Sequence, residues 1–247
     1  MYFNFSQLRL GDRKGLPSFF RLWNQKRAGF MSDNHIHISD NGYQMNVSNP
    51  IEQAMLTRIK KRGHGWVFSA SDFPDLGSRP AVDKALSRMA TAKTVRRVAR
   101  GLYDVPHQHP IVGLTAPDID SVAKALAGKT GTRLQPTGAY AANLLGLSDQ
   151  VPAKVVFLTD GRSKRVQLGK LDISLKQTSP RLMATAGSIS GLVIHALRYL
   201  GKAHVNEVTI NRLDSRLAPA DRKRLWADAA FAPTWIAGIM RRLAAGT

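Results

Sequence analysis

The sequence contains no cysteine in its 247 residues. Disulfides, thiolate nucleophiles and zinc sites built from cysteine are therefore excluded. It also lacks any apolar run close to the roughly 18 residues of a transmembrane helix, so it predicts no membrane span. No apolar stretch of about 7–15 residues follows the first basic residues, so no secretory signal peptide is predicted. A cytoplasmic protein is the expectation that follows from these absences.

Acidic residues are scarce, with 17 Asp and Glu against 36 Lys and Arg, which gives a formal net charge of +19. The excess is spread along the chain: 6 basic and 3 acidic residues lie in 1–45, 11 and 5 in 46–110, and 19 and 9 in 111–247. An excess of this size is typical of proteins that bind a polyanion such as nucleic acid. An acidic protein partner, or a need for solubility alone, would also account for it.

The order of helical and strand patterns predicts an α+β fold in three parts. Residues 1–46 show no sustained period and are predicted to be an irregular leader that need not be ordered. Residues 47–110 are predicted to form a winged helix-turn-helix DNA-binding domain, followed by a mixed α+β domain at residues 111–247. Because Met31 and Met45 lie in the leader, the native protein is alternatively expected to start at one of them.

The predicted DNA-binding domain opens with a clear helix start signal. Asn49 is suited to cap the helix, Pro50 to occupy its first position, and Glu52 to close a capping box. Apolar residues then recur at helical spacing up to Gly63, where the helix is predicted to end. Residues 66–68, Trp-Val-Phe, are predicted to form a short buried strand.

A short second helix is predicted to start at Ser69 or Ser71, and a third helix at Ser78, with Pro80 in its first turn. The third helix carries one apolar stripe, at spacings of three, four and seven, that must face the other two helices. This stripe consists of Val82, Ala85, Leu86 and Met89.

The opposite face of the third helix is the one that a docked helix-turn-helix presents to the major groove. Asp83 interrupts its basic character, and is expected either to accept a hydrogen bond from a cytosine amino group or to pair with Arg79 one turn away. The residues of this helix predicted to contact DNA are Ser78, Arg79, Lys84, Ser87 and Arg88.

Residues 94–106 are predicted to form a basic hairpin that turns at Ala99-Arg100-Gly101, because glycine adopts the turn conformation that other residues resist. A wing beside a recognition helix lies along the phosphate backbone or enters the minor groove, and arginine suits both places. The predicted DNA contacts here are Arg96, Arg97, Arg100 and Tyr103. The alternative is a solvated hairpin that only completes the core.

The C-terminal part alternates between helical and strand patterns. Helices are predicted at 117–127, 138–147, 189–200, 219–229 and 233–243, and strands at 155–158, 164–168 and 171–176.

Neither a catalytic nor a metal site is predicted in the chain. Asp160, Asp172 and Lys176 lie on or near neighbouring strands, but they lack the Asp-x-Lys spacing of a nuclease core. The His-x-His pairs at residues 35–37 and 107–109 have no further ligands at metal-binding spacing. We therefore expect no enzyme activity, no metal and no cofactor. A nucleic-acid-processing enzyme with a degenerate nuclease-like domain, and a protein-interaction module, remain as alternatives.

Two blocks of the sequence, which together cover roughly residues 50–200, resemble the AbiEi-type antitoxins of bacterial abortive-infection (type IV toxin–antitoxin) operons. The first is Gly77-Ser78-Arg79-Pro80-Ala81-Val82-Asp83-Lys84-Ala85-Leu86-Ser87-Arg88, followed by Arg100-Gly101-Leu102-Tyr103. The second, which is more specific, is Pro136-Thr137-Gly138-Ala139-Tyr140-Ala141-Ala142-Asn143-Leu144-Leu145-Gly146-Leu147, with Gln150-Val151-Pro152 and Leu158-Thr159-Asp160-Gly161.

The resemblance implies a winged-helix transcriptional repressor that binds the double-stranded DNA of its own operator. It also implies a C-terminal domain that counteracts a cognate nucleotidyltransferase-like toxin. It brings no catalytic residues with it.

Overall fold

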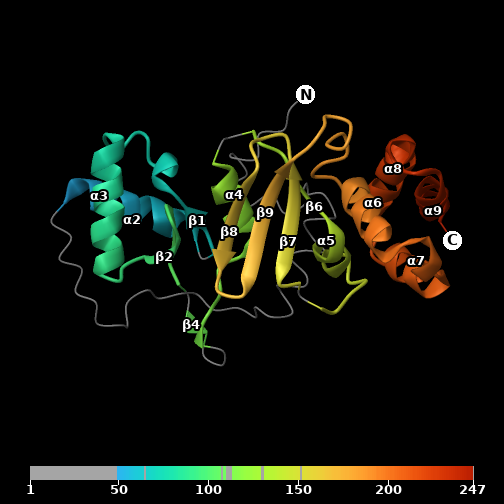
Figure 1. Cartoon of the computed structure of the whole chain (residues 1–247), viewed down its shortest axis with the longest axis horizontal. Helices are drawn as coiled ribbons and strands as arrows, with labels where there is room; N and C mark the ends of the chain where they lie inside the picture. The colour runs from blue at the N-terminus through green and yellow to red at the C-terminus, as the bar shows by residue number, and fades with distance from the viewer. Residues whose placement is uncertain are drawn as a thin grey trace. The chain divides into compact units, whose positions relative to one another are not determined.

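The computed structural model describes residues 49–63, 65–106, 108–109, 113–128, 131–150 and 152–246, so the predicted leader at 1–46 lies outside the described residues. The described chain is mixed α+β, as the sequence predicted. It divides into two compact units (Figure 1), between which the chain passes three times. We call the described residues within 49–134 and 152–179 the mixed unit, and those within 135–150 and 180–246 the helical unit.

The mixed unit begins with α2 (Pro50–Arg62), which confirms the first predicted helix. The side chain of Asn49 caps it by accepting a hydrogen bond from the Ile51 N–H at 2.9 Å. Met55 and Ile59 of the predicted apolar stripe are buried. Glu52, which was predicted to close a capping box, instead forms an ion pair with Arg88 on another helix.

The second and third predicted helices both form. A short 3-10 helix, η2 (Ala70–Asp72), follows β1 (Val67–Phe68), and Asp72 accepts a hydrogen bond from the Ser69 N–H at 2.8 Å. The next helix is α3 (Arg79–Thr91), whose predicted apolar stripe is fully buried. It packs on α2 and η2 around Phe68 and Phe73, whose rings meet edge to face.

The predicted basic hairpin forms β2 (Arg96–Ala99) and β3 (Leu102–Asp104), joined by a turn at Arg100 and Gly101. Gly101 has a φ of 73°, which explains the glycine. The antiparallel sheet has the order β1-β3-β2. Beyond it, β4 (Gln108–His109) and β5 (Gly113–Leu114) form a second antiparallel pair.

A second sheet in the mixed unit contains β7 (Lys154–Thr159), β8 (Lys164–Leu168) and β9 (Leu171–Gln177). Figure 1 shows β9 between the other two; it runs parallel to β7 and antiparallel to β8. The helix α4 (Ile119–Ala127) contacts both sheets, which is why the unit continues past the predicted domain boundary at residue 110.

The helical unit contains five α-helices, counted over its described residues. The strand β6 (Leu134–Pro136) leads into it from the mixed unit. Its central helix is α6, of which residues 189–197 are all buried, and Ser188 caps that helix by accepting a hydrogen bond from the Gly191 N–H. The helices are α5 (Gly138–Leu144), α6 (Ile189–Leu200), α7 (Glu207–Asp214), α8 (Pro219–Asp228) and α9 (Thr234–Ala245), with η3 (Lys202–His204) and η4 (Ala229–Phe231) between them.

The sequence block that carries most of the resemblance forms α5 and the turn that ends it. The Asn143 side-chain amide donates hydrogen bonds to the carbonyl oxygens of Ser148 and Gln150, both at 3.1 Å. Gly146 has a φ of 66°, and a Cβ there would lie 2.0 Å from the Arg216 guanidinium. That guanidinium in turn donates to the Leu145 carbonyl at 2.8 Å. The block therefore has a structural role in closing this turn.

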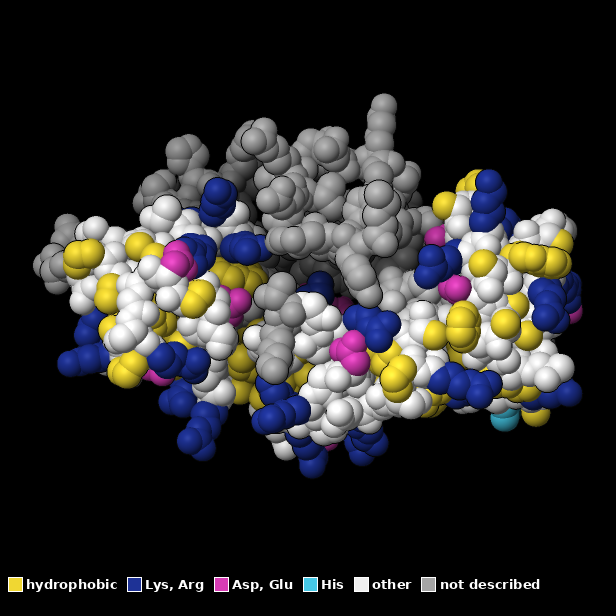
Figure 2. Space-filling view, turned by 90° about the horizontal axis from the view of Figure 1, so that it is seen from above, with side chains coloured by type: hydrophobic (Ala, Val, Ile, Leu, Met, Phe, Trp, Pro, Cys, Tyr) yellow, Lys and Arg dark blue, Asp and Glu magenta, His cyan; other side chains and the backbone are white. Residues whose placement is uncertain are grey.

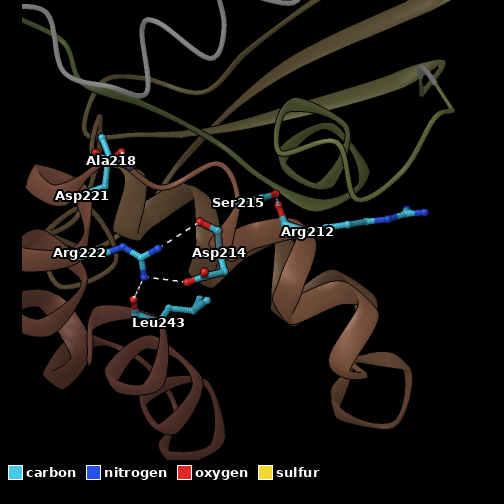
Figure 3. Close-up of polar contacts among 7 residues, drawn as sticks. All are labelled: Arg212, Asp214, Ser215, Ala218, Asp221, Arg222 and Leu243. Carbon is cyan, nitrogen blue, oxygen red and sulfur yellow. Dashed lines mark hydrogen bonds and ion pairs between the residues drawn. The ribbon is translucent and has the colours of Figure 1, made fainter. Parts of the chain in front are cut away.

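One arginine joins three helices of the helical unit (Figure 3). The guanidinium of Arg222, on α8, donates to the Asp214 carboxylate at 2.7 Å and to the Leu243 carbonyl of α9. Asp214 is the last residue of α7, a helix that was not predicted from the sequence. Because the charged Arg222 bonds to both a carboxylate and a backbone carbonyl, it fixes the positions of these helix ends relative to one another.

The buried His195 of α6 predicts a pH-dependent stability. Burial, helped by the charge of Arg198, lowers the pKa of His195 from 6.5 to about 4. The folded protein therefore keeps His195 neutral, while the unfolded chain takes up a proton below pH 6.5. Stability should thus fall as the pH drops from 6.5 toward 4, by up to about 3 kcal/mol.

Urea unfolding of wild type and of His195→Leu between pH 7.5 and 4 measures this effect. We expect the variant to lose most of the decline in this window. His204→Gln is the matched control, because His204 is exposed on η3, and it should keep the wild-type decline. Parallel pH profiles for wild type and His195→Leu would contradict the assignment.

Candidate nucleic-acid interface

The outward face of α3 is exposed along its length, as predicted. Arg79 donates to the Asp83 carboxylate at 2.9 Å and to the Ser71 hydroxyl at 3.3 Å. Of the two roles considered for Asp83, the structure therefore shows the pairing with Arg79. Because both side chains are more than half exposed, this contact adds little stability but orients the guanidinium at the N-terminal end of the helix.

Lys84 and Ser87 lie on the same exposed face. They border an open hollow along the C-terminal half of α3, lined by Lys84, Ser87, Arg88, Thr91 and Ala92. Ser78 occupies the N-cap position, but its side chain makes no capping hydrogen bond, contrary to the prediction that it caps the helix. The Ser78 hydroxyl is therefore not committed to the α3 N-terminus.

Arg88 is placed on the predicted face but has a structural partner. It forms an ion pair with Glu52 of α2 at 2.6 Å, and the Glu52 side chain is only 13% exposed. The pair connects two helices through residues that are 36 positions apart in sequence. Arg88 thus ties α3 to α2, and its charge is partly compensated.

On the hairpin, Arg97 and Arg100 are exposed, as a DNA-contacting wing requires. The other two hairpin residues that were predicted to contact DNA, Arg96 and Tyr103, are not exposed in this way. Arg96 lies opposite Asp104 in the register of β2 and β3, and donates to both of its carboxylate oxygens at 2.9 and 2.5 Å. Arg96 also donates to the Thr115 carbonyl at 3.1 Å, so its guanidinium is held within the protein.

Tyr103 was predicted to contact the DNA, at the phosphate backbone or in the minor groove, but it is 8% exposed. Its ring stacks on Phe68, with centroids 6.4 Å apart, and belongs to the core around α2 and α3. We remove Tyr103 and Arg96 from the candidate contacts for this reason. The remaining set is Ser78, Arg79, Lys84, Ser87, Arg97 and Arg100, with Arg88 at its edge.

The acidic residues of the segment 49–106 all have partners within the protein. Four of the five pair with arginine: Glu52 with Arg88, Asp75 with Arg58, Asp83 with Arg79 and Asp104 with Arg96. The fifth, Asp72, accepts from Ser69. Hydrogen bonding to Arg58 lowers the pKa of Asp75 to about 2, so that this pair stays ionised.

Within the described residues, the exposed Lys84, Arg97 and Arg100 form no ion pair. Lys60, Lys61 and Arg62 at the end of α2 and Lys93 after α3 are likewise exposed without an ion pair to any described residue, so the unpaired cations of this segment lie on α3, on the hairpin and at the end of α2. One hydrophobic core joins the helices to the strand residues Phe68 and Tyr103 and to Val95, which lies just before β2, so α3 and the hairpin belong to the same packed body.

The nuclease-like alternative finds no common site for its residues. Asp160 follows the end of β7, whereas Asp172 lies opposite Lys154 at the start of the parallel strand β9. Six residues of strand place the two about 20 Å apart. Each is also paired: Asp160 with Arg133 and Asp172 with Arg165, both at 2.8 Å. The hydrogen bond from Arg165 lowers the pKa of Asp172 below its ordinary value.

Among the described residues, no group of three or more His, Cys, Asp or Glu is placed to hold a metal ion. Residues 35–37 and His107, from the two His-x-His pairs, lie outside the described part of the chain. No described helix has the length and apolar character to cross a membrane.

Comparison with known proteins identifies one family. Its sequence model, described as a family of unknown function (DUF6088), matches residues 54–225. This range covers α3, the hairpin and the central part of the helical unit. Neither the curated proteins nor the solved structures gave a match.

Proposed function

The chain belongs to the DUF6088 family, and we propose that it is a DNA-binding transcriptional repressor that acts on its own operator. In this proposal the segment from α2 to β3 is a winged helix-turn-helix, with α3 as the recognition helix and the hairpin β2–β3 as the wing. The supporting features are the buried stripe of α3, its exposed opposite face, and the arginine-bearing turn of the hairpin. This arrangement is typical of helix-turn-helix proteins that read the major groove.

The observation that carries the proposal is the separation of charges in this segment. All five of its acidic residues have internal partners, while Lys84, Arg97 and Arg100 remain exposed on the two elements that would face DNA. Arg79 is held by Asp83 in a defined orientation, which suits an arginine that reads a guanine edge. Lys84, Arg97 and Arg100 would hold phosphates and set the register.

We further propose that the protein is an antitoxin, which counteracts a nucleotidyltransferase-like toxin. Its support is the resemblance to AbiEi-type antitoxins around Asn143 and Gly146, where α5 and its closing turn are built. If a nucleotidyltransferase gene adjoins this one, expressing it alone should arrest growth, and co-expression of this protein should restore growth. Continued arrest on co-expression would remove the antitoxin proposal and leave the repressor proposal intact.

Titration of the protein against its upstream DNA at several salt concentrations tests the repressor proposal. If Lys84, Arg97 and Arg100 each neutralise one phosphate, the logarithm of the affinity should fall against the logarithm of the salt concentration with a slope of about −2.7. An affinity that does not change with salt would contradict it.

Two substitutions distinguish a contact to a base from a contact to a phosphate. We expect Arg79→Ala to weaken binding to the operator by about 5- to 100-fold and binding to a scrambled duplex much less, because a base contact carries sequence information. We expect Arg100→Ala to weaken both duplexes alike and to reduce the salt slope by about 1. Equal losses on both duplexes for Arg79→Ala would exclude it as a base-reading residue.

A further inference from the structure

Large exposed apolar side chains occur on only one of the two units in the part of the chain that is described. They are Leu182, Tyr199, Val208, Trp226 and Phe231, and all belong to the helical unit. Trp226 is 61% exposed, although a buried Trp would contribute far more to stability. Figure 2 shows apolar side chains mixed with Lys and Arg over the C-terminal helices. Tryptophan and tyrosine are enriched at interfaces, so the exposed Trp226 points to a contact with a partner.

Two of the exposed apolar residues have a cation at helical spacing. On α8, Lys223 lies three residues before Trp226, so the two share the outward face, and both are exposed. On α7, Arg212 follows Val208 by four residues in the same way. At the end of α6, Tyr199 is exposed next to Arg198.

The acidic residues of these helices do not neutralise the cations, because they have other partners. Glu207 pairs with Arg242, Asp214 with Arg222, and Asp228 with Arg224. Asp221 is buried and accepts from the Ala218 N–H. Within the described residues, Arg198, Arg212 and Lys223 form no ion pair, so each faces solvent beside an exposed apolar side chain.

We propose that the outward face of α8 binds single-stranded RNA, with a base stacked on Trp226 and a neighbouring phosphate held by Lys223. Every base offers a flat face to an aromatic ring, and a neighbouring cation suits the backbone of the same strand. The face of α3 is different: its exposed side chains are polar and cationic, with no large apolar residue, which suits a duplex whose bases are stacked inside. Unpaired RNA loops and ends present the unstacked bases that exposed rings bind.

Fluorescence anisotropy with the full-length protein tests this proposal, using a labelled, unstructured 20-nucleotide RNA of mixed sequence. We expect Trp226→Ala to weaken RNA binding by about 5- to 100-fold, the range found when a stacking ring is removed, and Trp226→Phe to retain most of the affinity. Val208→Ala is the matched control, because it removes exposed apolar surface without removing a ring. It should change the RNA affinity by less than about 2-fold, as expected for truncation of a surface side chain.

Three further arms identify the ligand. An abasic oligonucleotide of the same length should bind no better to wild type than to Trp226→Ala, because it has no base to stack. Trp226→Ala should leave operator duplex binding unchanged, and Arg100→Ala should weaken the duplex but not the RNA, so that this inference and the repressor proposal fail separately. Equal binding of intact and abasic RNA by wild type would overturn the proposal. Displacement of the RNA by a polyglutamate peptide that binds wild type but not Trp226→Ala would also overturn the proposal, because the surface would then be a binding site for acidic protein.

Discussion

Gly191→Ala is expected to destabilise the helical unit by about 2–3 kcal/mol, although alanine is the better helix former. In an exposed helix interior, exchanging glycine for alanine gains about 1 kcal/mol. Gly191 lies in the first turn of α6, where the backbone has no space for a side chain. We therefore expect the packing term to exceed the propensity term and to reverse its sign.

The geometry around Gly191 leaves the structure few ways to relax. A Cβ there would lie 2.4 Å from the Thr185 carbonyl oxygen, which belongs to the backbone, and 2.3 Å from the Gln135 side-chain oxygen. Gln135 is itself buried, and its amide donates to the Pro136 carbonyl at 3.0 Å. Moving either group would disturb the start of α6, and overpacking of this kind costs about 1–3 kcal/mol or more.

Gly238→Ala provides the matched control. Gly238 lies within α9, and a Cβ there would meet no atom within 4 Å. We expect this variant to stabilise the same unit by about 1 kcal/mol. Hydrogen exchange of peptides that cover α6 and α9 reads both effects within the helical unit. If the two variants changed protection in the same direction, the close contact at Gly191 would be refuted.

Local sequence patterns predicted some elements of the fold, whereas elements that depend on contacts distant in sequence were missed. The helix α2, with a cap, an apolar stripe and a stop signal, follows from local patterns and was predicted at both ends, and the start and the apolar stripe of α3 were predicted in the same way. The helix α7 was missed because only Ile210 and Leu213 in it are buried, too few to give a period. The parallel pairing of β7 with β9 was missed because it joins segments by tertiary contact rather than by a turn.

In the candidate site, too, contacts local in sequence were predicted and contacts distant in sequence were not. The Arg79–Asp83 pair was anticipated because its members are one helical turn apart. The Arg88–Glu52 pair spans 36 residues, and no local pattern distinguishes Arg88 from a free cation. Arg96 and Asp104 face each other across a bulged hairpin, so even the known turn did not give their register. Sequence reasoning thus located the basic face but could not show which arginines were already engaged.

Arg96→Ala is expected to destabilise the mixed unit by about 3 kcal/mol, and this separates a structural arginine from a DNA-contacting one. The Asp104 side chain is 4% exposed, and Arg96 supplies both hydrogen bonds to its carboxylate oxygens. Removing one partner of a buried pair leaves an uncompensated charge, which costs about 3–5 kcal/mol. We take the lower end because Arg96 is itself 31% exposed.

Arg97→Ala is the control, one residue away on the same strand. Arg97 is exposed, so its loss should change stability by less than about 0.5 kcal/mol while weakening duplex DNA binding. Replacing both members of the pair, as in Arg96→Met with Asp104→Leu, should recover most of the stability lost in Arg96→Ala, because no buried charge remains. Urea unfolding and DNA titration of the same three preparations give the two readouts. An Arg96→Ala protein as stable as wild type but weaker on DNA would return Arg96 to the contact surface, since the ion pair would then contribute nothing to the fold.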